Sequence, residues 1–286
     1  HRTSDSGART MRKMIKTELR RAFCNRTFFV ILGLGLAFVI WHTVQYKIPY
    51  TRSLGVSYHG EELYPHNVYQ ECILGNSMSV HAYIYSMCLP ILAALPFGAS
   101  ACQDRQSGYR DQILTRTKRS TYYQAKWIAA FLSGAAAVVL PMIFDFIVTL
   151  WFFPTLPGDS MSRWDSVGID GMMAEIYYHM PMVYMLAKWM FLAAFGGIFA
   201  TMSLTAGMFA KNMVVVLLTP VLVQLLYNSA TSYLNARNWQ FMAYYTVYQS
   251  LFSMRLWKPV MVGGIMLLIC LLLYCRKASV KDALNT

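Results

Sequence analysis

The sequence has little charge: only 13% of its 286 residues are Asp, Glu, Lys or Arg. Soluble domains carry about 25% charged and about 45–50% apolar residues, whereas 56% of this chain is apolar. This shortage of charge excludes a disordered chain and a basic nucleic-acid-binding domain, and it argues against a soluble enzyme. A protein of several membrane-spanning segments remains, provided that the apolar residues form long runs.

The chain also lacks the motifs of a self-contained motor or hydrolase. It has no Gly-x-x-x-x-Gly-Lys-Ser/Thr phosphate loop, no His-Glu-x-x-His and no Gly-x-Ser-x-Gly. The acidic and histidine residues of 46–80 follow no zinc-ligand spacing. We therefore expect no catalytic residue, no metal and no cofactor bound by this chain.

The apolar residues form six runs of about 17 residues or more with almost no charge. None alternates with a period of two, so a membrane barrel is not expected. Helices satisfy their backbone polar groups internally, as lipid requires. The expected fold is an all-α polytopic membrane protein with a transmembrane domain over 28–275 and spans at 28–44, 81–102, 127–153, 182–210, 213–234 and 259–275.

The 25 Lys and Arg residues are distributed unevenly about these spans. Most lie before the first span, in the 103–126 loop, or in the 276–286 tail, and few lie in the connections at 46–80, 154–181 and 235–258. The positive-inside rule therefore predicts that both termini are cytoplasmic and that the latter three connections are outer loops. Of the six cysteines only Cys72 then lies clearly outside, so no exterior intrachain disulfide is expected.

Two different segments precede the first span. Residues 1–10 look unlike the rest of the chain, and we expect them to be disordered or a tag remnant. Residues 11–27 carry apolar side chains at spacings of three and four, with basic residues on the other side. This pattern predicts an amphipathic helix lying in the headgroup plane, although a simple positive-inside flank is an alternative.

The 103–126 loop carries a motif. It begins with an acidic residue, followed four positions later by Gly. A stretch ending in Leu, an Arg-Ser pair and a Lys at the start of the next span come after it. These positions are Asp104, Gly108, Leu114, Arg119, Ser120 and Lys126. This pattern resembles the loop between spans two and three of ABC-2 type permeases. That family often has Glu at the first position and Pro near Thr117, where this chain departs. A solvated basic connector is the alternative interpretation.

The resemblance to ABC-2 permeases implies a type V exporter-like fold and a mechanism. Two permease subunits, identical copies or paralogues, would each receive a cytoplasmic ABC ATPase subunit. ATP and magnesium would bind in that ATPase dimer, and a helix near 108–116 would dock on it. The residues implied in this coupling are Asp104, Gly108, Ile113, Leu114, Arg116, Arg119 and Lys126.

Asp145 and Lys188 are the charges that hydropathy alone would not predict inside spans. They fall at similar depth in consecutive antiparallel spans, so we predict an Asp145–Lys188 ion pair, direct or through a polar group. Lining of a translocation route and snorkelling of Lys188 to the interface are the alternatives.

The 235–258 segment is too polar to span a membrane and too aromatic for a free loop. We expect one short helix or a pair that dips into the outer leaflet, or a belt against the bilayer surface. Its aromatic residues include Trp239, Tyr244, Tyr245, Tyr248 and Phe252.

The sequence thus predicts the permease subunit of an ATP-driven exporter in a prokaryotic cell membrane, in contact with lipid and not with nucleic acid. Its cargo would be hydrophobic or amphipathic, such as a peptide, an antibiotic or a lipid-like molecule. A self-sufficient channel or ion-coupled carrier is one alternative, and a peptide-binding immunity or signalling protein is another.

Overall fold

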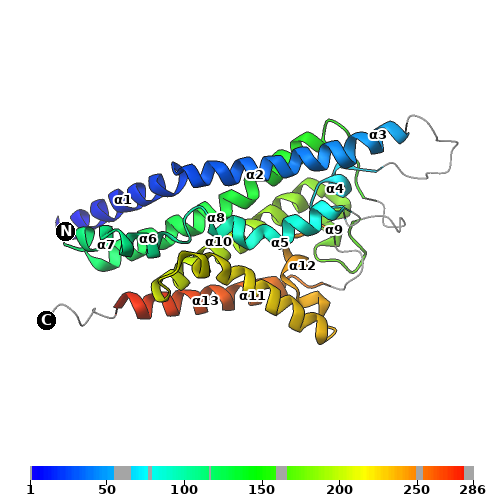
Figure 1. The fold of residues 1–286 in the computed structure, drawn as a ribbon. Coiled ribbons are helices and arrows are strands. Elements are labelled where there is room, and N and C mark those ends of the chain that lie inside the picture. Colours follow the sequence, from blue (N-terminus) through cyan, green and yellow to red (C-terminus); the bar gives the residue numbers. More distant parts are fainter. Residues whose placement is uncertain are drawn as a thin grey trace.

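The computed structural model describes residues 2–54, 66–76, 79–115, 117–158, 166–248 and 254–279. These residues form an elongated bundle of helices that run mostly along its long axis (Figure 1). The elements are α1 (Arg2–Phe23), α2 (Arg26–His42), the π-helix η1 (Thr43–Lys47), α3 (Ile48–Leu54), α4 (Val68–Glu71), α5 (Val80–Ala94), α6 (Ser100–Gln106), α7 (Tyr109–Leu114), α8 (Arg119–Thr149), α9 (Ala174–His179), α10 (Pro181–Phe209), α11 (Met213–Tyr233), the 3₁₀ helix η2 (Arg237–Trp239), α12 (Phe241–Tyr245) and α13 (Trp257–Ser279).

The bundle has two distinct ends. The end that carries the start of α1, the end of α13 and the short helices α6 and α7 is called the basal end (Figure 1). The opposite end, with α3, α4 and α9, is called the loop end.

Five helical segments of the described residues are long and apolar enough to cross a membrane. They are Arg26–Arg52, Arg119–Thr149, Pro181–Phe209, Met213–Tyr233 and Trp257–Ser279. Many of their large apolar side chains are exposed, among them Phe29, Leu226 and Leu268. Such side chains on the outside of a bundle suit contact with lipid. The chain is thus a helical polytopic membrane protein.

The second predicted span differs from its expected form. Its helix, α5, has only 15 residues and is about 22 Å long, which is less than the roughly 30 Å hydrocarbon core. The helix ends before Pro96, which has no N–H to continue it. At Gly98 a Cβ would lie 2.7 Å from Ser203 Oγ, so the turn brings the backbone close to α10. A turn over residues 95–99 therefore separates α5 from α6, in place of the continuous helix predicted over 81–102.

The first predicted span is longer than expected. The helix does not end near Val44 but continues through η1 into α3. In η1 the N–H of Ile48 donates to the Thr43 carbonyl, five residues earlier. Ile48, whose N–H closes this π-turn, directly precedes Pro49, whose ring has no N–H to donate. Lys47, predicted to lie in an outer loop, is therefore helical and fully buried.

The centre of the bundle is the pair α8 and α10, which pack closely. Small residues allow this approach: a Cβ on Gly134 would lie 2.3 Å from the Ala200 Cβ, and one on Gly196 would lie 2.5 Å from Val138. The small residues noted at spacings of four thus mark a helix–helix contact, as is usual in membrane bundles.

The amphipathic α1 begins at Arg2, so it includes most of residues 1–10, which were predicted to be disordered or a tag remnant. Only one Gly and no Pro interrupt that stretch, which lets the helix extend towards the N-terminus. The helix ends at Phe23, and the side chain of Asn25 caps α2 by accepting from Thr27 N–H. The apolar face of α1 packs on α8, with Met14 and Ala22 buried.

Candidate functional site

Five buried or half-buried polar side chains meet at the basal end, and we call them the basal ion cluster: Glu18, Arg21, Asp104, Tyr122 and Lys126. Asp104 is its centre. Its carboxylate accepts hydrogen bonds from Arg21 Nη2 at 2.6 Å, from the Tyr122 hydroxyl at 2.6 Å and from the Lys126 ammonium. Glu18 accepts from Arg21 at 2.9 Å and lies 3.6 Å from the Lys126 nitrogen. Two carboxylates thus balance two cations.

Three elements supply the basal ion cluster. Glu18 and Arg21 are three residues apart on one face of α1, and Tyr122 and Lys126 are four apart on one face of α8. Asp104 lies on α6, and joins the two longer helices. Burial alone would raise the pKa of Asp104. The hydrogen bond from Arg21 and the charge of Lys126 lower it by a larger amount, so the pKa lies below its ordinary value.

Helix α7 is the short helix predicted near 108–116, and it begins after Gly108. Gly108 has φ +72°, a left-handed conformation that glycine adopts without strain. The guanidinium of Arg21 lies over the Tyr109 ring, 4.1 Å from its centroid. Ile113 and Leu114 are half-buried against the apolar cluster around α1 and α8.

The predicted coupling residues are therefore only partly brought together. Asp104 and Lys126 bind each other directly, while Arg119 at the start of α8 lies over the Tyr123 ring, 5.8 Å from its centroid. Arg116 lies outside the described residues. On α7, Asp111 and Gln112 are exposed, so this helix presents a polar surface at the basal end.

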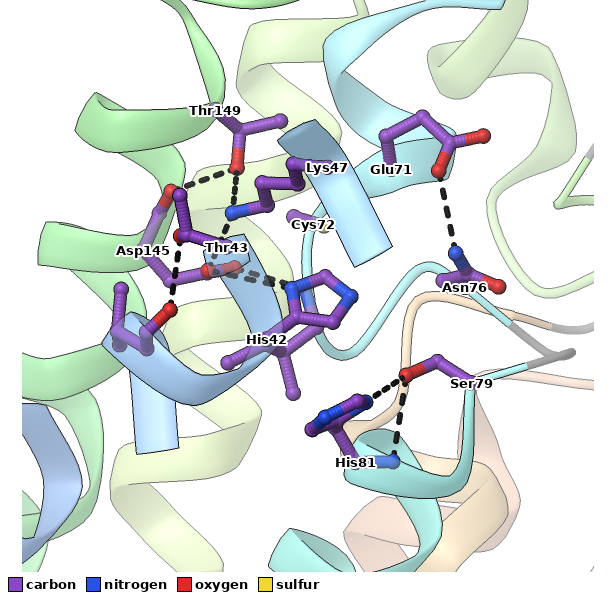
Figure 2. Close-up of polar contacts among 12 residues, drawn as sticks. His42, Thr43, Lys47, Glu71, Cys72, Asn76, Ser79, His81, Asp145 and Thr149 are labelled. Carbon is purple, nitrogen blue, oxygen red and sulfur yellow. Dashed lines mark hydrogen bonds and ion pairs between the residues drawn. The ribbon is translucent and has the colours of Figure 1, made fainter. Parts of the chain in front are cut away.

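A second group of charges lies near the loop end, and we call it the loop-end ion cluster: His42, Lys47, Asp145 and Thr149 (Figure 2). Lys47 Nζ lies 2.7 Å from both Asp145 Oδ1 and Thr149 Oγ1. Asp145 Oδ2 accepts the Ile73 backbone N–H at 2.7 Å. His42 Nδ1 is 3.8 Å from Asp145 Oδ1.

The direct Asp145–Lys188 ion pair that we predicted is wrong, because the structure pairs Asp145 with Lys47 instead. Lys47 reaches Asp145 from the unforeseen continuation of the first helix. Lys188 is 1% exposed, and its ammonium donates to the Tyr244 carbonyl at 3.4 Å and lies 5.5 Å from the Tyr184 ring centroid. Asp145 and Lys188 do line the same small cavity.

Polar contacts continue from the loop-end ion cluster towards α4 and α5. The His81 ring is 5.0 Å from the His42 ring, centroid to centroid, and its nitrogens contact Ser79 Oγ at 2.9 Å and Gln45 Oε1 at 3.2 Å. Nearby, Asn76 donates to Glu71 at 3.1 Å (Figure 2). The described residues contain no group of three or more His, Cys, Asp or Glu side chains suited to a metal ion.

The aromatic segment predicted to lie outside, 235–258, contains two short helices, η2 and α12, which matches the predicted pair of short helices. Tyr244 and Tyr245 are fully buried, and the Tyr245 hydroxyl donates to the Ser86 carbonyl at 3.2 Å. Tyr248 N–H donates to the Leu74 carbonyl at 3.3 Å, and Trp239 packs edge-on against Trp257. Phe252 lies outside the described residues. This segment is thus packed into the bundle.

Sequence reasoning missed His42, Lys47, Glu18 and Arg21 as members of ion clusters. For Glu18 a signal was present, because it is the one acidic residue of the basic segment 11–27. Lys47 carried only an indirect signal: no Pro or Gly separates it from the first apolar run, so the helix could continue.

Comparison of the chain with protein-family models, with curated proteins and with solved structures gave no match. What the chain does must therefore be inferred from its own side chains and their arrangement.

Proposed function

We propose that this chain is the membrane subunit of an ATP-driven ABC-2 type transporter. Two six-span permeases, identical or paralogous, would pair in a cell membrane with both termini in the cytoplasm. A separate ABC ATPase dimer would bind at the basal end and hold the ATP and magnesium. The turn around Pro96 would allow α5 and the start of α6, up to about Cys102, to complete a sixth crossing.

One observation carries the proposal: Arg21 connects the exposed helix α7 to the buried basal ion cluster. Its guanidinium lies over Tyr109 of α7 and binds both Glu18 and Asp104. Asp104 in turn binds Lys126 of α8. A displacement of α7 by a docked ATPase would therefore act on α1, α6 and α8 through charged contacts.

The breaking of those contacts is costly, which favours movement of the three helices as one unit. Removal of one partner from a buried ion pair costs about 3–5 kcal/mol, because the remaining charge is uncompensated. We infer that ATP-driven movement of α7 is passed to the bundle through the intact basal ion cluster. The abundant apolar surface suits a hydrophobic or amphipathic cargo, such as a peptide, an antibiotic or a lipid-like molecule.

Co-purification tests the proposal. The full chain, isolated from its own cells in mild detergent, should retain an ATPase subunit. Asp111→Lys, which reverses an exposed charge on α7, should reduce that retention. Glu175→Lys, a matched reversal at an exposed position of α9 near the other end of the bundle, should not. Absence of any ATPase, or equal loss in both variants, would contradict the docking assignment.

Arg21→Gln separates docking from coupling. Since Arg21 is one-third exposed and lies behind α7, this variant should still bind the ATPase. It should, however, lose cargo-stimulated ATP hydrolysis in reconstituted vesicles. If Arg21→Gln hydrolyses ATP and moves cargo as wild type does, the basal ion cluster is not the coupling route.

An ion-coupled carrier is the second candidate, and the loop-end ion cluster is the observation that favours it. Its ionisable residues are His42, Lys47 and Asp145, and Lys188 lies outside the cluster but lines a small cavity with Asp145. All four are buried within apolar helices, and such residues often mark ion pathways. Reconstituted vesicles without any ATPase distinguish the two functions. Cargo uptake driven by a proton gradient alone would support the carrier.

A further inference from the structure

Two adjoining cavities at the basal end have opposite chemical character. The first is an apolar groove of about 610 Å³ between α1, α8 and α13. Its apolar wall includes Met11, Trp127, Ile128, Leu271 and Ala278. Along α8 it extends from Arg119 to Ile128, about 14 Å at the rise of an α-helix. Of these three helices, α8 and α13 are apolar enough to span a membrane, so an acyl chain of the surrounding lipid can reach the groove along them.

The second cavity, of about 440 Å³, is strongly basic. Its lining includes one carboxylate, Asp111, and the six cations Arg105, Arg110, Arg119, Lys126, Lys211 and Lys277. The basal ion cluster neutralises Lys126, and Arg110 donates to Asp111 at 3.0 Å. Within the described ranges no carboxylate pairs with Arg105, Lys211 or Lys277. The cavity therefore has excess positive charge that an anionic ligand would balance.

The two cavities share part of their lining. Arg119 and Tyr123 line both. Tyr123 is 4% exposed, and in the described part of the chain its hydroxyl has no hydrogen-bond partner. The indole N–H of Trp127, in the groove, is also without a partner there. An apolar groove that shares Arg119 and Tyr123 with a basic pocket, with one unpartnered donor at the junction and a second in the groove, matches an amphiphile with an anionic head.

We propose that the apolar groove and the basic pocket together bind one anionic phospholipid of the surrounding membrane. An acyl chain would lie in the groove beside Leu271 and Cys275, and the phosphate would lie in the pocket near Lys211 and Lys277. Basic pockets between spanning helices characteristically bind anionic headgroups. The site is independent of any ATPase, so it can be present whether or not the chain is a permease.

The test is a lipid titration of the purified chain in detergent, with bound lipid counted by native mass spectrometry. Dioleoyl-phosphatidylglycerol should bind at least about tenfold more tightly than dioleoyl-phosphatidylcholine, because only the former has a net negative charge. The double variant Lys211→Gln, Lys277→Gln should weaken phosphatidylglycerol binding roughly 25-fold, at about fivefold for each cation near the lipid phosphate.

A matched variant controls for the general loss of charge. Lys13→Gln, Lys16→Gln removes two exposed cations of α1 that line neither cavity, and it should change binding by less than about threefold. Cys275→Phe fills the groove, so it should weaken the binding of both lipids. The melting temperature of each variant in lipid-free detergent reports whether the variant is folded.

Several results would overturn the proposal. Equal affinity for the two lipids, or equal losses in the two double-lysine variants, would remove the headgroup site. Binding of soluble glycerophosphate as tightly as phosphatidylglycerol would assign the pocket to a free anion. If Lys211→Gln, Lys277→Gln released a bound ATPase while lipid binding stayed unchanged, the pocket would belong to a protein partner.

Discussion

Substitution of Lys47 by Met removes the charge that compensates the buried Asp145. Both side chains are almost fully buried, at 0% and 1% exposure. After Lys47→Met, Asp145 keeps the Ile73 N–H as a donor and His42 at 3.8 Å, but it loses its closest cation, the Lys47 ammonium. An uncompensated buried charge costs about 3–5 kcal/mol. At about 2–4 °C for each kcal/mol, the melting temperature should fall by about 6–20 °C.

Lys188→Met is the matched comparison, because Lys188 is equally buried but has no carboxylate partner. Its ammonium contacts only the Tyr244 carbonyl and the Tyr184 ring among the interactions of the described residues. Burial of a charge without a counterion is unfavourable. Replacement by an apolar side chain of similar length should therefore leave the stability unchanged or raise it.

The double variant Lys47→Met, Asp145→Asn tests the pairing itself. Each single change leaves one buried charge alone, whereas the double change removes both. The double variant should therefore be more stable than the sum of the single losses predicts, with a coupling of about 1–3 kcal/mol. The assay is thermal unfolding in detergent at pH 7, followed by circular dichroism for wild type, the three single variants and the double variant.

Two results would refute this reasoning. One is a loss of stability in Lys188→Met as large as that in Lys47→Met, which would mean that Asp145 interacts equally with both lysines. The other is strict additivity of Lys47→Met and Asp145→Asn, which would mean that the 2.7 Å contact contributes nothing to folding.

Two further predictions concern the basal end and the helix contacts. The pKa of Asp104 is lowered in the fold, so its stabilisation is complete above the ordinary carboxyl pKa of about 3.9 and is lost as the pH falls through the lowered value. Asp104→Asn should lower the melting temperature at pH 7 and flatten its fall below about pH 4, where the Asp104 contribution is lost; curves that stay parallel below about pH 4 would contradict this. Gly134→Ala should cost about 1–3 kcal/mol, because the new Cβ meets Ala200. Gly33→Ala, with open space around it, should be neutral or gain up to about 1 kcal/mol, and equal melting temperatures for the two variants would contradict the close contact.

The long helices could be predicted well because lipid imposes a simple rule. A run of apolar residues must satisfy its own backbone, and helix is the local solution. Thus the span predicted over 182–210 is found at Pro181–Phe209, and the one over 213–234 at Met213–Tyr233. Their boundaries carry local signals: Asn212 caps the second of them by accepting from the Val214 N–H.

The ion partners could not be predicted because they depend on contacts between distant segments. The loop motif selected Asp104 and Lys126, but Arg21, which binds Asp104, lies 83 positions away in the sequence. Lys47 was misplaced because a lysine after an apolar run normally marks the end of a span. Only the continuation of the helix through the π-turn at Thr43–Lys47 brings it to Asp145.

The two ion clusters place charges at two separated points of one helix. Lys126 near the start of α8 and Asp145 near its end are 19 positions apart, about 29 Å along an α-helix. The basal ion cluster joins α8 to α1 and α6, while the loop-end ion cluster joins α8 to the helix that follows α1. Since each contact is costly to break and α10 packs closely on α8, the helices α1, α2, α6, α8 and α10 should move together, and α11 and α13 are then the helices left to move against them. A permease that alternates between two states would need such a division, and cross-links confined to the first group should leave transport intact.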